Sequence, residues 1–216
     1  YLGINKLHDA ALGLNALAFA RIEDQDYNHA AGKGNQVIFN ATGQSSNKEY
    51  LDLYGTTYTI ETTFTNGIPG AAKLKTVYDG DDAGNQQNGI RSQDNLAWSA
   101  NGSAYLLEDR AISNDTAWGT QEGSVWKLDP ATGKAQRMLQ IDRSAIPAGM
   151  TDNLAKGVID SKGNVTESAS GQWETSGVID VSGLYGHAPG TDYFLDVQEH
   201  GLQDGRSEEH TSELQS

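Results

Sequence analysis

The 216-residue sequence predicts an all-β protein, and three observations support this fold class. Short segments rich in β-branched and aromatic residues recur along the chain, as is typical of strands. Turn sequences separate them, such as Asn101-Gly102 and the PATGK stretch of residues 130–134. No stretch has the length and the 3.6-residue apolar period of a long amphipathic helix. The chain is long enough to bury a sizeable core within one domain.

The elements follow from these patterns in chain order. Residues 1–20 are rich in leucine and suit either a helix or a strand with a loop, whereas residues 21–28 are polar and acidic. A polar loop is expected at residues 79–93, where glycine, asparagine and aspartate are frequent. Outside the central part of the chain, the segments expected to be strands are residues 35–41, 50–54, 57–64, 73–78, 157–160, 164–166, 178–181 and 193–198.

Residues 95–140 contain the clearest structural unit. Two hairpins are expected there, one joined by Asn101-Gly102 and one by PATGK, with strands at residues 95–99, 103–108, 124–129 and 135–140. Four short antiparallel strands in about 45 residues match the size of one propeller blade. We therefore expect a partial β-propeller of four-stranded antiparallel blades, with about three to four blades in this chain.

Composition excludes several classes of partner. The formal net charge of -14 argues against nucleic acid and against anionic membranes. No run of 18 apolar residues is present, so no segment is expected to span a membrane. The chain has no cysteine, which excludes disulfides and cysteine-based zinc sites.

The end of the chain has a different character. Residues 206–216 read RSEEHTSELQS, which is identical to the translation of a common sequencing-library adapter. We interpret this stretch as a non-native tail. Residues 1–205 are then expected to be a fragment of a propeller domain that lacks blades at both ends.

Acidic residues recur at the edges of the expected strands. An unpaired buried carboxylate is costly, so these acids are expected to meet a cation, a basic side chain or a hydrogen-bond network. Calcium takes six to eight oxygen ligands, which acids from several converging blades could supply together. The alternative is that these acids simply solvate the rims of the sheets. Arg21 and Arg110 each flank an acidic segment and are expected to pair with it or to bind a phosphate oxygen.

Four motifs in the same order resemble the PhoX-type alkaline phosphatases and their phytase-like propeller relatives. FARIEDQDYN at residues 19–28 is similar to the RPED-type element of that family, and QDNLAW with YLLED, within residues 93–109, is similar to its DNL and QED segments. WETSGVIDVSGLYG at residues 173–186 resembles its ESSGIIDVS element, and FLDVQEH at residues 194–200 its DVQAH element.

The resemblance implies a secreted or periplasmic six-bladed propeller that hydrolyses phosphate esters with calcium in its central channel. Iron is a second metal of the phosphatases, but their characterised iron-dependent members place a cysteine near the irons, so calcium is the firmer expectation here. The metal ligands implied are Glu23, Asp94, Glu108, Asp109, Glu174 and Asp196. The residues implied in substrate binding or in supporting the ligands are Arg21, Asn95 and His200.

Two functions fit this reading, and the sequence assigns no catalytic residue. The first is a metal-dependent phosphoric-ester hydrolase, and the second is a non-catalytic, calcium-stabilised propeller that binds a ligand or partner. Both predict that the carboxylates of Glu23, Asp94, Glu108 and Glu174 point towards one shared cavity. A phosphatase should also present cationic groups for the phosphate beside the metals.

Overall fold

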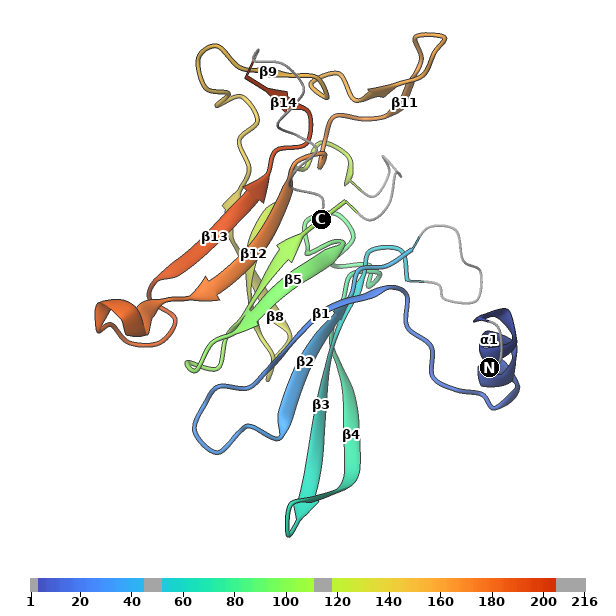
Figure 1. The fold of residues 1–216 in the computed structure, drawn as a ribbon, viewed down its shortest axis with the longest axis vertical. Helices are drawn as coiled ribbons and strands as arrows, with labels where there is room; N and C mark the ends of the chain where they lie inside the picture. Colours follow the sequence, from blue (N-terminus) through green and yellow to red (C-terminus); the bar gives the residue numbers. More distant parts are fainter. Residues whose placement is uncertain (1–3, 45–51, 111–117, 205–216) are drawn as a thin grey trace.

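The computed structural model describes residues 4–44, 52–110 and 118–204, and this part of the chain is predominantly β-structure (Figure 1). Two four-stranded antiparallel sheets, each built from four consecutive strands, form its centre. The all-β prediction is therefore confirmed. The tail at residues 206–216 lies outside the described residues.

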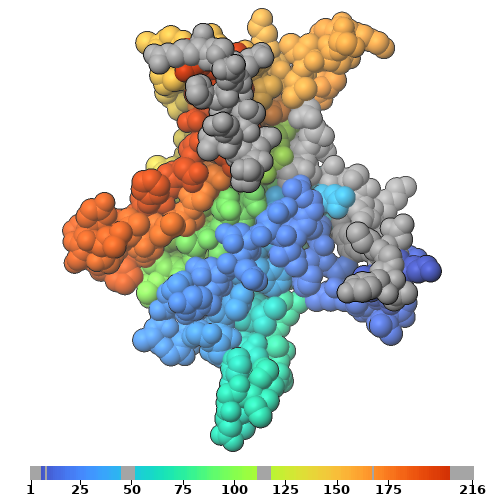
Figure 2. Space-filling view, in the orientation of Figure 1, coloured from blue at the N-terminus to red at the C-terminus, as the bar shows by residue number. Residues whose placement is uncertain are grey.

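The first sheet is formed by β1 (Ile22–Tyr27), β2 (Gln36–Ala41), β3 (Thr56–Thr65) and β4 (Ile68–Asp79), in that order. Its last two strands meet at Asn66-Gly67, where both residues have positive φ, as an Asn-Gly hairpin turn requires. This hairpin projects away from the rest of the molecule (Figures 1 and 2). The strand β1 was not predicted, because its residues are polar or acidic apart from its two ends.

The second sheet confirms the four-stranded unit predicted within residues 95–140. Its strands are β5 (Gln93–Trp98), β6 (Ala104–Glu108), β7 (Ser124–Asp129) and β8 (Lys134–Gln140). Gly102 and Gly133 lie in the two predicted turns with φ of 89° and 73°, values that favour glycine. The strands β6 and β7 are mostly buried, β5 is buried at three of its six residues, and the outer strand β8 is mostly exposed.

The second sheet packs on both of its faces. The main core lies between the two sheets and contains Ile38, Val77, Tyr78, Ile90, Leu96, Trp98, Ala104, Leu106, Trp126 and Leu128. On the opposite face, Tyr105, Leu107 and Val125 pack against Val178 of a third, two-stranded sheet. The sheets therefore follow one another face to face in chain order.

The third sheet pairs β12 (Glu174–Asp180) with β13 (Tyr193–Gln198), and the 3-10 helix η1 (Ser182–Tyr185) lies between them. The strand expected at residues 178–181 thus begins earlier, at Glu174. Two short pairs complete the β-structure, β9 (Thr151–Asp152) with β14 (Leu202–Gln203), and β10 (Val158–Ile159) with β11 (Val165–Glu167).

Two further expectations concern the first part of the chain. The leucine-rich start forms a helix, α1 (Ile4–Gly13), which stands off from the sheets in Figure 1. The expected strand at 50–54 lies partly outside the described residues. For the described part the prediction is wrong, because Asp52 makes only a single bridge to Gln44 and a bend follows.

In the described part of the chain, none of the helices has the length and apolar character that a membrane span requires.

The first two sheets are joined by side chains along the free edge of β5. Asp24 Oδ2 accepts a hydrogen bond from the backbone N–H of Leu96 at 2.9 Å, and Asp26 Oδ2 accepts one from Trp98 at 2.7 Å. Asn40 Nδ2 donates to the carbonyl of Asp94 at 3.0 Å. We call these contacts, at alternate positions 94, 96 and 98, the edge ladder. It explains why an acidic segment forms the strand β1, because its carboxylates satisfy the N–H groups of β5.

Candidate metal centre

Three carboxylates from separate parts of the chain meet where β5 and β12 begin. Asp94 is the second residue of β5, Asp109 directly follows β6, and Glu174 is the first residue of β12. Each offers a carboxylate oxygen, and these oxygens all lie within 4.8 Å of one another. We call Asp94, Asp109 and Glu174 the acidic trio.

The strand pairing explains how the trio forms. The strands β5 and β6 are antiparallel with Gln93 opposite Glu108, so the start of β5 lies beside the end of β6. Thr175 attaches β12 to this edge, because its hydroxyl accepts a hydrogen bond from the N–H of Glu108 at 2.8 Å and lies 3.1 Å from the carbonyl of the same residue. Thr175 follows Glu174 and Glu108 precedes Asp109, so this contact brings the two acids of the trio together.

Residues at the start of β1 place further charges beside the trio. Arg21 Nη2 donates to Glu23 Oε1 at 3.1 Å. Burial is the largest cause of a raised pKa for both Asp94 and Asp109, and the Glu23 carboxylate adds to it, whereas the Arg21 guanidinium opposes it. Arg21 also has φ of 59°, a left-handed conformation that is uncommon for a residue with a side chain. Glu23 and Arg21 are therefore close enough to act on the trio, although Glu23 is not one of its members.

Glu174 has two further polar neighbours. His200 Nε2 lies 3.3 Å from Glu174 Oε2, and Gln198 Nε2 donates to Glu174 Oε1 at 3.4 Å. His200 was expected to bind substrate or to support the metal ligands, and the structure places it beside Glu174. Gln198 and Thr175 were not predicted as site residues. The pairing of β12 with β13 sets Glu174 opposite Gln198, and the sequence prediction missed this contact because it began the first of these strands at residue 178.

The trio is electrostatically unfavourable without a cation. Burial is the largest cause that raises the pKa of Asp94 to about 7, followed by the charges of Asp109, Glu23 and Glu174. Burial also raises the pKa of Asp109, and burial followed by the charge of Asp109 raises that of Glu174. A divalent cation would relieve this repulsion, and carboxylate oxygens are the ligands that calcium and magnesium prefer. The donor set therefore fits a hard divalent cation.

The structure places Glu108 away from the trio. Its carboxylate is fully buried, and Oε1 accepts hydrogen bonds from the Arg91 N–H at 3.0 Å and from Trp126 Nε1 at 2.7 Å. Neighbouring residues of an extended strand point to opposite faces, so Glu108 and Asp109 cannot both face one cavity. Burial raises the pKa of Glu108 to about 7, because the ionised carboxylate is less stable in the core than in water.

Two other predicted site residues stay outside the trio. Asp196 is exposed on β13 and is not among the three converging acids. Asn95 Oδ1 accepts a hydrogen bond from the Ser176 hydroxyl at 3.5 Å, so it links β5 to β12. Asn95 thus supports the strands that carry the trio.

A separate cleft lies farther along the same strands. It has a volume of about 420 Å³ and is lined by residues of β5 from Leu96 to Trp98, by Val178 to Asp180 of β12, and by His29 and His187. None of the acidic trio lines it. Each histidine is held by a carboxylate, His29 by Asp26 at 3.0 Å and His187 by Asp192 at 2.6 Å.

Comparisons of this chain with protein-family models, with curated proteins and with solved structures return no match.

Proposed function

We propose that this chain is part of a secreted, metal-dependent phosphoric-ester hydrolase, with the acidic trio as ligands of a calcium ion. One observation carries the proposal, namely that three carboxylates from distant segments bring oxygens within 4.8 Å of one another. The motif resemblance to the PhoX-type family supplies the reaction class. Calcium is proposed as the resident metal, and iron as a second metal would follow only from that resemblance.

The fold part of the proposal is a β-propeller. Its support is that β1, β5 and β12 each begin a sheet, and that the sheets pack face to face in chain order. In a propeller, the first strand of each blade lines the central channel. Asp94 lies on β5 and Glu174 on β12, while Glu23 lies on β1 and Arg21 directly precedes that strand.

The proposed roles follow from the contacts of the chain. Asp94, Asp109 and Glu174 would hold the cation, while His200 and Gln198 fix the Glu174 carboxylate. When bound, the cation supplies charge neutralisation for the phosphate ester and polarises its phosphoryl oxygen. Arg21 lies beside the trio, where its guanidinium can bind two oxygens of a phosphate group bidentately.

Glu174→Gln tests the proposal, because the amide keeps the size of the side chain and removes a charge that the cation needs. We expect lower calcium content after dialysis and slower hydrolysis of p-nitrophenyl phosphate, with both losses appearing together. Glu61→Gln is the matched control, since Glu61 is an exposed acid on β3, far along the chain from the trio.

The outcomes separate the candidate functions. Wild-type calcium content and activity in Glu174→Gln would contradict the assignment of the site. Calcium binding by the wild-type protein without phosphatase activity would favour the calcium-stabilised binding propeller instead. Activity that survives chelation in the wild-type protein would contradict metal dependence.

A further inference from the structure

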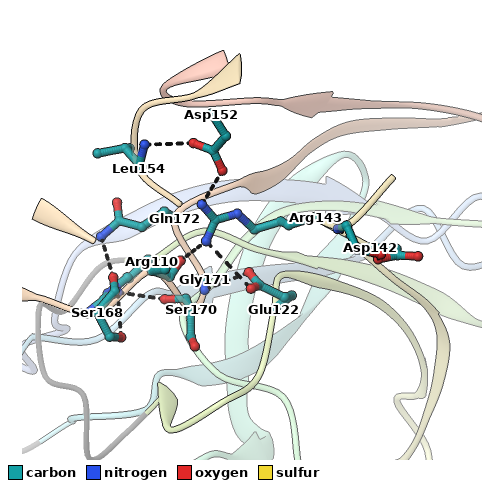
Figure 3. A network of polar contacts seen from close by, with 12 residues as sticks. Arg110, Glu122, Asp142, Arg143, Asp152, Leu154, Ser168, Ser170, Gly171 and Gln172 are labelled. Carbon is teal, nitrogen blue, oxygen red and sulfur yellow. Dashed lines mark hydrogen bonds and ion pairs between the residues drawn. The ribbon is translucent and has the colours of Figure 1, made fainter. Parts of the chain in front are cut away.

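The segment that leads into Glu174 is held by side chains from other parts of the chain (Figure 3). Arg110 Nη1 donates to the carbonyls of Ser168 at 2.9 Å and Ser170 at 2.6 Å. Arg143 Nη1 donates to the carbonyl of Ala169 between them. Three successive carbonyls are thus bound by two guanidinium groups. We call residues 168–172 the entry turn.

The N–H side of the entry turn is also fixed. Glu122 Oε2 accepts a hydrogen bond from the Gly171 N–H at 2.9 Å. Gly171 has φ of 73°, and a Cβ built on it would lie 2.5 Å from the Trp118 ring, so only glycine fits there. The entry turn is therefore held on one side by Glu122 and Trp118, and on the other by the two arginines.

Arg143 is itself anchored by a buried ion network. Its side chain is 9% exposed, and it pairs with Asp152, whose side chain is 1% exposed, and with Glu122 Oε1 at 3.7 Å. Its guanidinium also lies 5.7 Å from the centre of the Trp173 ring. Breaking such a buried network by removing one partner costs stability. Arg143 therefore serves both the core and the entry turn.

Arg110 differs from Arg143 in what it connects. It directly follows Asp109, and the turn that it holds ends two residues before Glu174. The Arg110 guanidinium thus connects the chain directly after Asp109 to the turn that precedes Glu174. Arg110 was expected to pair with acidic neighbours or to bind phosphate. Its guanidinium also contacts the entry turn, through the carbonyls of Ser168 and Ser170 and the Ser168 hydroxyl at 3.5 Å.

We propose that Arg110 is a positioning residue that sets the distance between the carboxylates of Asp109 and Glu174, and so sets the affinity of the trio for a divalent cation. This inference rests on the proposed metal site. Side chains that orient metal ligands from outside typically contribute about 10- to 100-fold in metal affinity. If the Arg110 contacts only stabilised the fold, their removal would lower the free energy of unfolding and leave the cation affinity of the folded protein unchanged.

The test measures calcium affinity by calorimetry and unfolding by urea in chelator, on the same variants. Arg110→Met removes the carbonyl contacts and should weaken calcium binding by about 10- to 100-fold. Arg110→Lys keeps a donor and should recover part of that affinity. Arg137→Met is the matched control, because Arg137 packs on Trp126 at 4.6 Å and bonds Gln121, without touching the entry turn.

The calcium affinities of the Arg110 and Arg137 variants decide whether Arg110 positions the trio. Weakened calcium binding in folded Arg110→Met, partial recovery in Arg110→Lys and wild-type affinity in Arg137→Met would support it. Wild-type affinity in Arg110→Met, or an equal loss in Arg137→Met, would overturn it while leaving the metal site intact. If Arg110→Met does not fold, Arg110→Lys carries the test, and wild-type affinity in that variant overturns the inference. A wild-type protein that binds no calcium would instead overturn the proposed function, and the inference with it.

Discussion

Replacing Asp94 by asparagine should stabilise the metal-free protein at alkaline pH, although it removes a proposed ligand. In the folded state, burial and three neighbouring acids raise the pKa of Asp94 from 3.8 to about 7. A raised acid pKa means that the folded state binds the proton more tightly than the unfolded state does. The stability of the metal-free protein should therefore fall as the pH rises from about 4 to about 7, and should stay low above that range.

The size of the effect follows from the shift. The difference between 3.8 and about 7 corresponds to roughly 4 kcal/mol of unfavourable free energy when the carboxylate is ionised. Asp94 is only partly buried, so solvent screening reduces this figure, and we expect roughly 2 kcal/mol. For a chain of this size, that gain would raise the melting temperature of Asp94→Asn by about 4–8 °C at pH 8 in chelator.

The assay is thermal unfolding of wild type, Asp94→Asn and the exposed control Glu61→Gln, each with chelator and with excess calcium. Calcium should stabilise the wild type more than Asp94→Asn, because a cation that binds only the folded state stabilises it by mass action. A metal-free Asp94→Asn less stable than wild type at pH 8 would refute the reasoning. So would a wild-type protein whose metal-free stability does not fall between pH 5 and pH 8.

Two further predictions concern acids outside the trio. Asp26→Ala should lower the free energy of unfolding, measured in urea, by about 1–3 kcal/mol, because the Trp98 N–H loses its 2.7 Å hydrogen bond. Asp26→Asn keeps an acceptor and should lose less stability. Equal stability of Asp26→Ala and wild type would show that the contact contributes nothing. Burial, followed by the charge of Asp81, raises the pKa of Asp52 to about 7, so Asp52→Asn should gain roughly 1–2 kcal/mol at pH 8 and much less at pH 4. A loss of stability at pH 8 in the same urea assay would contradict this environment for Asp52.

The sequence predicted the second sheet well, because its strands and turns carry strong local signals. Asn101-Gly102 and the PATGK stretch fixed two hairpins whose strands the structure reproduces within two residues at each end. The strand β1 was missed for the opposite reason, since acids such as Asp24 and Asp26 disfavour a strand locally. The pairing of β1 with β2 and the acceptance of two β5 N–H groups, about 70 residues later in the chain, stabilise that strand.

The candidate site was predicted only in part. Asp94, Asp109 and Glu174 were among the expected ligands, and the structure brings these three together. Glu108 was expected beside them, but both faces of β6 are buried, so the pattern of the strand could not show which neighbour faces the core. The entry turn was not predicted at all, since its contacts join residues up to about 60 positions apart in the chain.

The edge ladder has a consequence for association with other chains. An unpaired strand edge offers N–H and C=O groups to any passing strand, which is a common start of domain swapping and fibril growth. At positions 96 and 98 of β5, carboxylates accept the N–H groups and offer no backbone in return. A foreign strand would have to displace two charge-assisted hydrogen bonds and bury the carboxylates that it released. These contacts therefore disfavour pairing of a foreign strand with β5, and they join the first two sheets through side chains and not through a continuous backbone ladder.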